Sequence, residues 1–219
     1  MVISAHPDDE LLGVGGTIAK HVAEGDEVHA VVVSEGATAR YAETAKNELQ
    51  EAGRRAAAVL GLRSLEFLGF PDQRLDTFSL LDVIQRIERE LDRVKPAVVY
   101  THFAGDLNKD HRIVCEAVMT ACRPIGSDFP RRVLWFETPS STEWTPPGLA
   151  APFAPNVFID ISAHLEKKLE AMSCYTSELR PAPHPRSTEA LRDRAAYWGQ
   201  IITRRYAEAF VLAREVIGS

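Results

Sequence analysis

Six consecutive residues near the start of the chain, Ala5-His6-Pro7-Asp8-Asp9-Glu10, place an imidazole and adjacent carboxylates in one turn. They follow the apolar residues Met1-Val2-Ile3, which predict a buried strand. Pro7 disfavours the helical region for the residue before it, so the polar side chains leave the strand on a fixed turn. Groups that can bind a cation and move a proton are therefore expected at the carboxyl end of a strand, where open α/β sheets bind ligands.

His6 and Asp9 are three residues apart across this turn, a spacing that can bring a nitrogen and an oxygen onto one ion. A catalytic zinc site typically has three protein ligands and keeps a fourth position for water. The best candidates for a third ligand lie in the segment 101–111, which also follows a predicted strand. His102 ends that strand, whereas His111 begins a helix from which it can point back over the strand ends. Together these residues indicate a metal-dependent hydrolase.

The elements that must position these residues alternate along the chain. Strands are predicted at 1–3, 27–33, 65–68, 97–100, 132–137 and 156–160. Helices are predicted at 18–24, 42–60, 80–94, 110–121, 162–174 and 188–206. This alternation predicts right-handed βαβ units in a Rossmann-like, doubly wound, mostly parallel α/β sheet with helices on both faces. We expect a single domain over residues 1–219, in which the proline-containing segment 138–155 is a long functional loop.

Composition narrows the function further. The chain has 219 residues, of which 45% are hydrophobic and 26% charged, as in one large globular domain. A net charge of −6 and the lack of a Lys/Arg run argue against nucleic-acid binding. No apolar run approaches the roughly 20 residues of a membrane span, and no signal peptide precedes the first strand, so we expect a cytoplasmic protein with no membrane partner. Three cysteines without a CxxC pair are expected to be buried thiols: Cys115, Cys122 and Cys174. Assembly into a homo-oligomer stays open.

The run at 5–10, together with Asp110-His111 at the start of a predicted helix, resembles the PIG-L/LmbE-like zinc-dependent N-deacetylases. The resemblance covers most of the chain, from the first motif to the segment 207–210. It implies an LmbE-like fold and one Zn²⁺ ion. The zinc ligands that it implies are His6, Asp9 and His111.

The resemblance also implies an activity, removal of the N-acetyl group from an N-acetylglucosamine-type amino sugar. Water activated by the metal is the nucleophile, and Asp8 acts as general base on this water and then as acid toward the leaving amine. Asp8 cannot share the direction of Asp9 on the turn, which leaves its carboxylate free to move a proton. Asp110 is expected to orient a neighbouring group.

Asn108 marks a departure from one form of the family pattern. Some members carry His-Pro-Asp-His at 108–111, and the first histidine helps to stabilise the tetrahedral oxyanion. The amide of Asn108 can donate a hydrogen bond to an oxyanion, but it supplies neither a proton nor a positive charge. Asp8 would then perform both proton transfers. His102 is a second candidate for this assistance.

Four further residues are candidate substrate contacts. Glu35 ends the second predicted strand, and Asp72 lies in a loop where family members place an aspartate that binds sugar hydroxyls. Each could equally be a solvated turn residue. His184 and Arg186 lie in a proline-stiffened loop, and a guanidinium suits a phosphate or carboxylate of a substrate. The same loop could simply lead into the next helix. Trp144 is the best aromatic candidate for stacking on a sugar ring.

Other functions fit the same residues. One alternative is a metal-dependent amidase or phosphoesterase acting on a substrate that is not a sugar. Another is a non-catalytic sugar- or nucleotide-binding module with a structural metal. The glycines at 13–16 do not indicate a dinucleotide site, because the phosphate-binding glycines should lie in the first turn, which the residues at 6–10 already occupy. Close packing of a helix on the sheet explains these glycines better.

Overall fold

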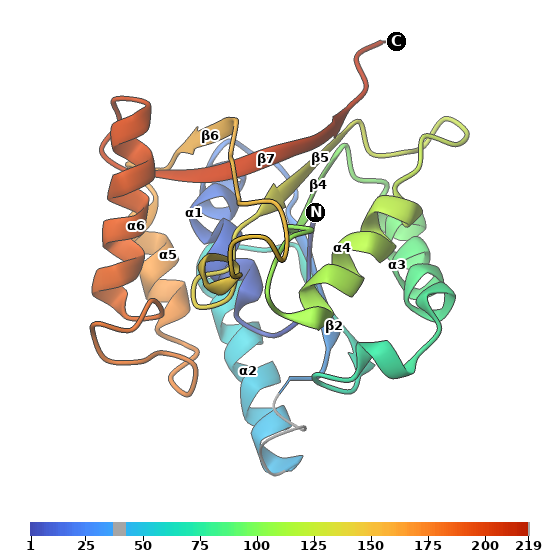
Figure 1. Ribbon diagram of the computed structural model, residues 1–219, viewed down its shortest axis with the longest axis horizontal. Helices are drawn as coiled ribbons and strands as arrows, with labels where there is room; N and C mark the ends of the chain where they lie inside the picture. Colours follow the sequence, from blue (N-terminus) through green and yellow to red (C-terminus); the bar gives the residue numbers. More distant parts are fainter. Residues whose placement is uncertain (37–42, 219) are drawn as a thin grey trace.

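One seven-stranded sheet runs through the computed structural model, which describes residues 1–36 and 43–218 (Figure 1). The strands are β1 (Val2–Ser4), β2 (His29–Ser34), β3 (Ser64–Phe70), β4 (Val98–His102), β5 (Arg132–Phe136), β6 (Val157–Asp160) and β7 (Ala207–Glu215). Their order across the sheet is β3-β2-β1-β4-β5-β7-β6. Pairs among β1 to β5 are parallel, and β7 is antiparallel to both of its neighbours. The prediction of a mostly parallel sheet is confirmed.

Helices cover both faces of this sheet. They are α1 (Asp9–Ala23), α2 (Glu43–Leu60), α3 (Leu80–Val94), α4 (Lys109–Ala121), α5 (Leu165–Met172) and α6 (Thr188–Ile201). In Figure 1, α3 and α4 lie on one side of the sheet and α1, α2, α5 and α6 on the other. Among the described residues, one apolar cluster joins α3 and α4 to the sheet, and a second joins the other four helices to the opposite face. The doubly wound architecture is therefore confirmed. Among the described residues, no helix is both long enough and apolar enough to cross a membrane.

The central strands β1 and β4 set the position of the site. In the sheet register, Ile3 of β1 pairs with Val31 of β2 on one side and with Thr101 of β4 on the other. The chain runs from β1 to β2 on one side, whereas β4 is added on the other side after β3 and α3. The connections that leave β1 and β4 diverge at this switch in strand order, which opens a crevice at the carboxyl ends of the strands.

The first helix begins earlier than predicted. We expected a helix at 18–24, but α1 begins at Asp9. The glycines in its first half have low helix propensity, but they allow the helix to pack closely against the sheet. A Cβ atom on Gly13 would lie 2.3 Å from Cδ2 of Phe136, and one on Gly16 would lie 2.6 Å from Cδ1 of Ile161. Packing against the sheet thus outweighs the low helix propensity, and Asp9 lies in the first helical turn. The start of α2 was predicted at Ala42, which lies outside the described residues.

The last strand was not predicted. The expected helix at 188–206 ends at Ile201, and β7 then inserts between β5 and β6. The first residues of β7 are Ala-Glu-Ala, which are weak strand formers and gave no strand pattern. Long loops at 103–108 and 138–155 follow β4 and β5; the second loop contains a short 3₁₀ turn, Thr142–Trp144.

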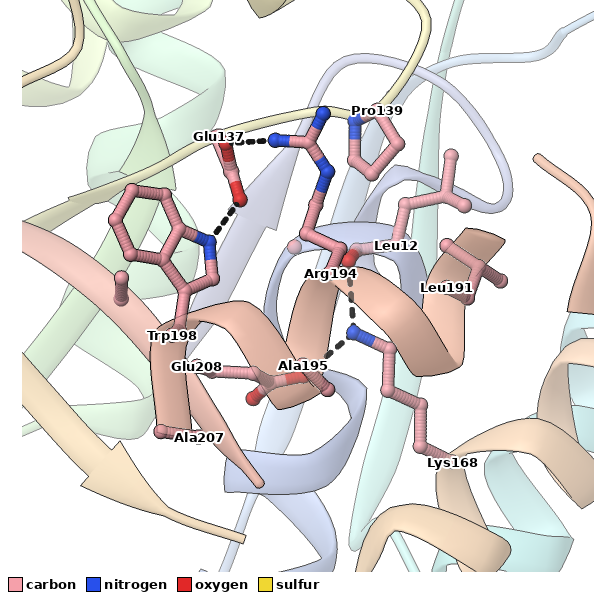
Figure 2. Close-up of a pocket in the computed structure, with 12 residues that line it drawn as sticks. Leu12, Glu137, Pro139, Lys168, Leu191, Arg194, Ala195, Trp198, Ala207 and Glu208 are labelled. Atoms are coloured by element: carbon pink, nitrogen blue, oxygen red, sulfur yellow. Dashed lines mark hydrogen bonds and ion pairs between the residues drawn. The ribbon is translucent and has the colours of Figure 1, made fainter. Parts of the chain in front are cut away.

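A buried ion pair ties β7 to two helices (Figure 2). The Glu208 carboxylate accepts the backbone N–H groups of Gly16 and Thr17, at 2.9 and 2.7 Å, and Lys168 Nζ of α5 lies 2.6 Å from its Oε1. Lys168 also donates to the carbonyl oxygen of Leu12 at 2.8 Å. Because each charge is matched by its partner, this ion pair is best explained as a structural joint between α1, α5 and β7.

Candidate metal centre

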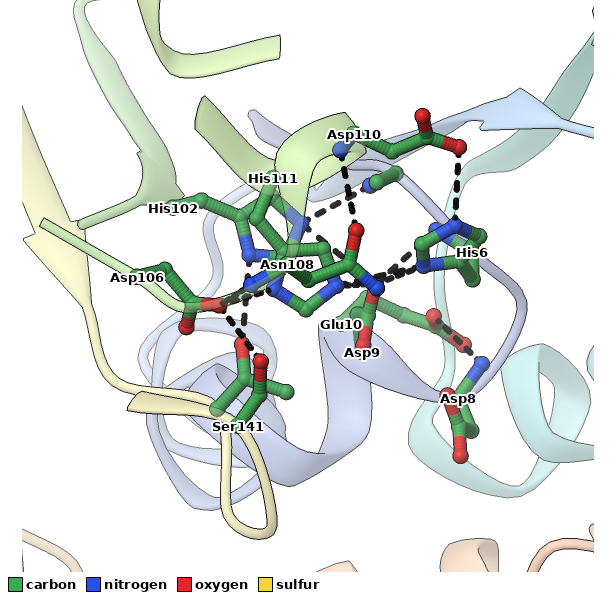
Figure 3. Close-up of polar contacts among 12 residues, drawn as sticks. His6, Asp8, Asp9, Glu10, His102, Asp106, Asn108, Asp110, His111 and Ser141 are labelled. Carbon is green, nitrogen blue, oxygen red and sulfur yellow. Dashed lines mark hydrogen bonds and ion pairs between the residues drawn. The ribbon is translucent and has the colours of Figure 1, made fainter. Parts of the chain in front are cut away.

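The turn after β1 is held in an unusual backbone conformation. Asp8 has φ 102° and ψ −29°, in the left-handed region that non-glycine residues rarely adopt. Its N–H donates to Glu10 Oε2 at 3.1 Å, and its carbonyl oxygen accepts the N–H groups of the first turn of α1. Glu10 Oε1 in turn accepts the hydroxyl of the fully buried Tyr175 at 2.7 Å. This conformation aims Asp8 and Asp9 in different directions (Figure 3).

Three side chains from the turn and from α4 converge on one point. His6 Nδ1 lies 3.2 Å from Asp9 Oδ2 and 3.2 Å from His111 Nε2, and His111 Nε2 lies 3.3 Å from Asp9 Oδ2. Since these three separations are nearly equal, the three candidate ligand atoms form a nearly equilateral triangle, here called the ligand triangle (Figure 3). Two corners of a tetrahedron around zinc are about 3.3 Å apart at ordinary Zn–N and Zn–O distances. The residues present therefore fit the ligand set of a tetrahedral metal ion.

The charges of the surrounding groups favour a cation at this point. Burial opposes positive charge on His6, but the carboxylates of Asp110 and Asp9 outweigh it and raise the pKa of His6 to about 10. Burial likewise opposes charge on His111, but Asp9 and Asp106 raise the pKa of His111 to about 9. The second carboxylate oxygen of Asp9, Oδ1, is buried with no hydrogen-bond partner among the described residues. This cluster is arranged to bind positive charge.

In each of the two histidines, the ring nitrogen outside the ligand triangle lies close to a carboxylate. His6 Nε2 lies 3.2 Å from Asp110 Oδ2 and 3.3 Å from Asp72 Oδ1, and His111 Nδ1 lies 3.1 Å from Asp106 Oδ1. Such partners fix the ring orientation and tautomer of a metal-binding histidine. Asp110 is the residue for which an orienting role was expected, and this role stays a prediction.

Asp106 was missed by the sequence analysis. It is buried, and it accepts the hydroxyl groups of Ser141 and Thr142 from the loop after β5. Burial alone would raise the pKa of Asp106, but His111 and these hydroxyl groups lower it to about 2. Its carboxylate is therefore available to His111 as an anion. The only hint in the sequence was a second acidic residue in the segment that ends at His111.

His102 has a different place from His111. It is fully buried; its Nε2 accepts the N–H of Ala5 at 2.8 Å, and its Nδ1 lies 3.1 Å from Thr138 Oγ1. Its ring stacks on that of His111, with centroids 4.0 Å apart. Burial, together with the charge of His111, lowers the pKa of His102 to about 4. His102 thus anchors the residue before His6 as a neutral ring and supports His111 from behind.

Asp8 lies outside the ligand triangle, next to the guanidinium group of Arg186. Its Oδ2 accepts a hydrogen bond from Nη1 of Arg186 at 3.0 Å. Burial raises the pKa of Asp8 well above its usual range, and the charge of Arg186 opposes that effect. A carboxylate with these properties can accept and return a proton.

The triangle opens into a pocket of about 540 Å³, large enough for a sugar-sized ligand. Of the candidate substrate contacts, the pocket wall includes Asp72, His184 and Arg186, but not Glu35, whose neighbour Gly36 lines it instead. Trp144 stands half-exposed at the rim, edge-on to the ring of His184, with centroids 6.0 Å apart. The pocket lining therefore combines aromatic rings with carboxylates.

Asn108 also lines this pocket, at the start of α4. Its Oδ1 accepts the N–H of Asp110 at 2.9 Å, which fixes the orientation of the amide. Its NH₂ group has no acceptor among the residues that the structure describes. The amide is therefore free to donate a hydrogen bond into the pocket.

Comparisons with known proteins show which family and which relatives this chain is similar to. The PIG-L family, described as GlcNAc-PI de-N-acetylase, matches residues 1–122. The uncharacterized deacetylase YaiS of Escherichia coli is 31% identical, over 81% of this chain and 90% of its own length. The diacetylchitobiose deacetylase of Thermococcus kodakarensis is 29% identical, over 95% of this chain and 80% of its own length.

Two further comparisons mark the breadth of the resemblance. The 4-oxalmesaconate hydratase of Pseudomonas putida is 29% identical, over 81% of this chain and 73% of its own length. Among solved structures, the conserved protein TT1542 of Thermus thermophilus is 26% identical with a TM-score of 0.78, covering 100% of this chain and 96% of that one.

Proposed function

Because the chain belongs to the PIG-L family, we propose that it is a metal-dependent deacetylase that removes the N-acetyl group from an N-acetylglucosamine-type amino sugar. The observation that carries this proposal is the triangle of His6, Asp9 and His111 with Asp8 beside it but outside it. A site that only stores a structural metal has no need of a separate buried carboxylate next to the ligands. The diacetylchitobiose deacetylase of T. kodakarensis supports the choice of substrate class.

We propose Zn²⁺ as the ion, held by His6, Asp9 and His111. Two imidazole nitrogens and one carboxylate oxygen form a ligand set found in catalytic zinc sites. Zinc bound there supplies Lewis-acid polarisation and lowers the pKa of water toward 7. Asp110 and Asp106, which lie 3.2 and 3.1 Å from the two imidazole rings, are proposed to hold them in the orientation that this ligand set requires.

The chain's own residues account for the proton transfers. Asp8 accepts a proton from the attacking water and later gives it to the amide nitrogen as the C–N bond breaks, so that acetate and a free amine result. The NH₂ group of Asn108 is placed to donate a hydrogen bond into the pocket, which helps to orient the acetamide. Asp72 and His184 are proposed to bind sugar hydroxyls, and Trp144 to stack on a sugar ring.

Residues 1–219 are proposed to act as one catalytic domain. The strand that precedes the turn with His6 and Asp9, β1, and the strand nearest the end of the chain, β7, belong to the same sheet. The buried Glu208 of β7 also binds the helix that begins at Asp9. Separating the segment that contains β1 from the segment that contains β7 would break the core on which the site rests.

Hydration is a second candidate, because a relative of this chain is described as a 4-oxalmesaconate hydratase. A centre that activates water can in principle add it to a C=C bond as well as to an amide. The reactions differ in their products, since only amide hydrolysis releases acetate and an amine. The comparisons reported above do not favour a phosphoesterase or a non-catalytic binding module.

The decisive experiment measures metal content and acetate release together. Purified protein loaded with Zn²⁺ is incubated with N-acetylglucosamine, N,N'-diacetylchitobiose and glucosaminides that carry other substituents, and acetate is quantified. We expect one bound zinc per chain and metal-dependent acetate release that chelation abolishes. The control is an incubation with 4-oxalmesaconate. Water addition to that compound without acetate release from the panel would overturn the deacetylase assignment.

A further inference from the structure

The guanidinium of Arg186 is fixed in the wall of the pocket by three acceptors. Its Nη1 donates to Asp8 Oδ2 at 3.0 Å and to Glu178 Oε2 at 3.1 Å, and its Nε donates to Ser140 Oγ at 2.7 Å. These acceptors come from the turn after β1, the connection between α5 and α6, and the loop after β5. The side chain is only 22% exposed. The side chain of Arg186 is therefore held in a defined position in the pocket wall.

The remaining nitrogen of this group is free to bind something else. An arginine has five N–H donors in a planar fork, and the three contacts above use Nη1 and Nε. No acceptor for Nη2 exists among the residues that the structure describes. Arg186 lines the same pocket as His6 and His111. A charged donor with two unused N–H groups thus borders the space where the substrate is expected.

The proposed reaction develops a charge that such a group would stabilise. When water attacks an amide, negative charge develops on the carbonyl oxygen, and fixed donors that face this oxygen accelerate the reaction. Three other nitrogen groups of the pocket are less suited to this task. Asn108 is neutral, Lys109 pairs with Asp76 at 2.7 Å, and Arg180 donates to backbone carbonyl groups of its own loop.

We propose that Arg186 is a catalytic residue whose Nη2 donates to the carbonyl oxygen of the substrate as that oxygen becomes negative; this inference rests on the deacetylase function proposed above. While the proton of the attacking water passes to Asp8, negative charge moves from Asp8 to the carbonyl oxygen, and the guanidinium borders both. When the C–N bond breaks, the proton passes to the nitrogen and the carbonyl group forms again as part of acetate. Arg186 thereby supplies the positive charge that Asn108 lacks.

The alternative use of Arg186 is to bind an anionic group of the substrate, and a neutral substrate separates the two. N,N'-diacetylchitobiose carries no anionic group. If Arg186 acts on the carbonyl oxygen, Arg186→Gln lowers kcat for this substrate by about 100-fold, whereas KM stays within about threefold of the unsubstituted protein. The matched control is Arg192→Gln, because Arg192 pairs with Glu166 outside this pocket. We expect the control to retain full kcat.

Two readouts distinguish catalysis from a structural role. Zinc content and Tm are measured for each variant, and Arg186→Ala is assayed with and without added guanidinium ion. Partial recovery of kcat by guanidinium, at unchanged zinc content, supports the proposal. Should Arg186→Gln fail to fold, Arg186→Lys takes its place; it keeps the charge but loses the fork, and we expect its kcat to fall at least tenfold.

Several results would overturn the inference. They are an unchanged kcat in Arg186→Gln, a raised KM with unchanged kcat, and a loss of activity that follows a loss of zinc. An Arg186→Lys variant with full kcat would do the same. If the unsubstituted protein releases no acetate from any substrate, the deacetylase function itself fails, and this result is distinct from an active protein that does not need Arg186.

Discussion

The hydroxyl group of Tyr175 donates a 2.7 Å hydrogen bond to Glu10 Oε1, although the two residues are 165 positions apart in the chain. The other carboxylate oxygen of Glu10 accepts the N–H of Asp8, whose backbone is in the left-handed region. A buried tyrosine from beyond α5 thus holds the conformation of the turn that carries the proposed base. The polar residues of the turn depend on a contact that forms only in the complete fold.

Tyr175→Phe tests this dependence. The change removes one hydrogen bond to a buried carboxylate, so the free energy of unfolding should fall by about 1–3 kcal/mol. With its support weakened, Asp8 should be less well positioned, and we expect kcat to fall by about tenfold at unchanged zinc content. Urea unfolding and acetate release measure the two effects. Tyr197→Phe is the control, because Tyr197 is 57% exposed. Equal effects of the two substitutions would contradict the proposed support.

Asp8→Asn separates the base from the metal ligands. Asparagine keeps the shape of the side chain but cannot accept a proton in the same way, and Asp8 lies outside the ligand triangle. We expect zinc content to stay the same and kcat to fall by about 10²- to 10⁴-fold. Metal analysis and acetate release on the same preparation give both numbers. An Asp8→Asn protein that keeps its activity would rule out the proposed mechanism.

Asp106→Asn tests the carboxylate behind His111. An amide orients the imidazole ring less strongly than a carboxylate does, and zinc affinity should fall by about 10- to 100-fold. Competition with a chelator measures this affinity. Asp76→Asn is the matched control: Asp76 also pairs with a cationic side chain, Lys109, but it is exposed. His111→Ala, which removes a ligand, should lower zinc content further. Unchanged zinc affinity in Asp106→Asn would show that His111 needs no such partner.

How far the fold could be predicted depended on whether its causes were local. The helix Leu80–Val94 was predicted with its observed bounds. The causes of these bounds are local, since Ser79 caps the start of the helix and its apolar residues recur on one face. The predicted start of α1 was wrong, since a helix was expected only from Ile18, whereas α1 begins at Asp9. The close packing expected for the glycines at 13–16 is present, but it depends on distant side chains such as Phe136. Strand β7 was missed because its placement depends on two neighbouring strands and on Lys168.

The candidate site follows the same rule. His6 and Asp9 were predicted from the spacing in a short motif, and the choice of His111 over His102 came from the family resemblance. The sheet brings the three residues together because β1 and β4 are neighbours. Asp106 and the contact between Arg186 and Asp8 were not predicted. Both depend on loops whose path no periodicity describes, since residues 138–155 and the connection between α5 and α6 fold over the pocket from other parts of the sheet.

Lys168→Met tests whether the buried ion pair in Figure 2 is the joint that fixes β7. Methionine fills much of the same space but leaves the Glu208 carboxylate buried without its cation, which should lower the free energy of unfolding by about 3–5 kcal/mol. The backbone N–H groups of Gly16 and Thr17 still donate to Glu208, so we expect the lower end of this range. Lys167→Met is the control on the same helix: Lys167 is exposed and pairs with Glu170 at 3.4 Å, and its loss should cost less than about 1 kcal/mol. Urea unfolding at constant zinc concentration compares the two variants, and similar values for both would mean that the pair does not stabilise the sheet.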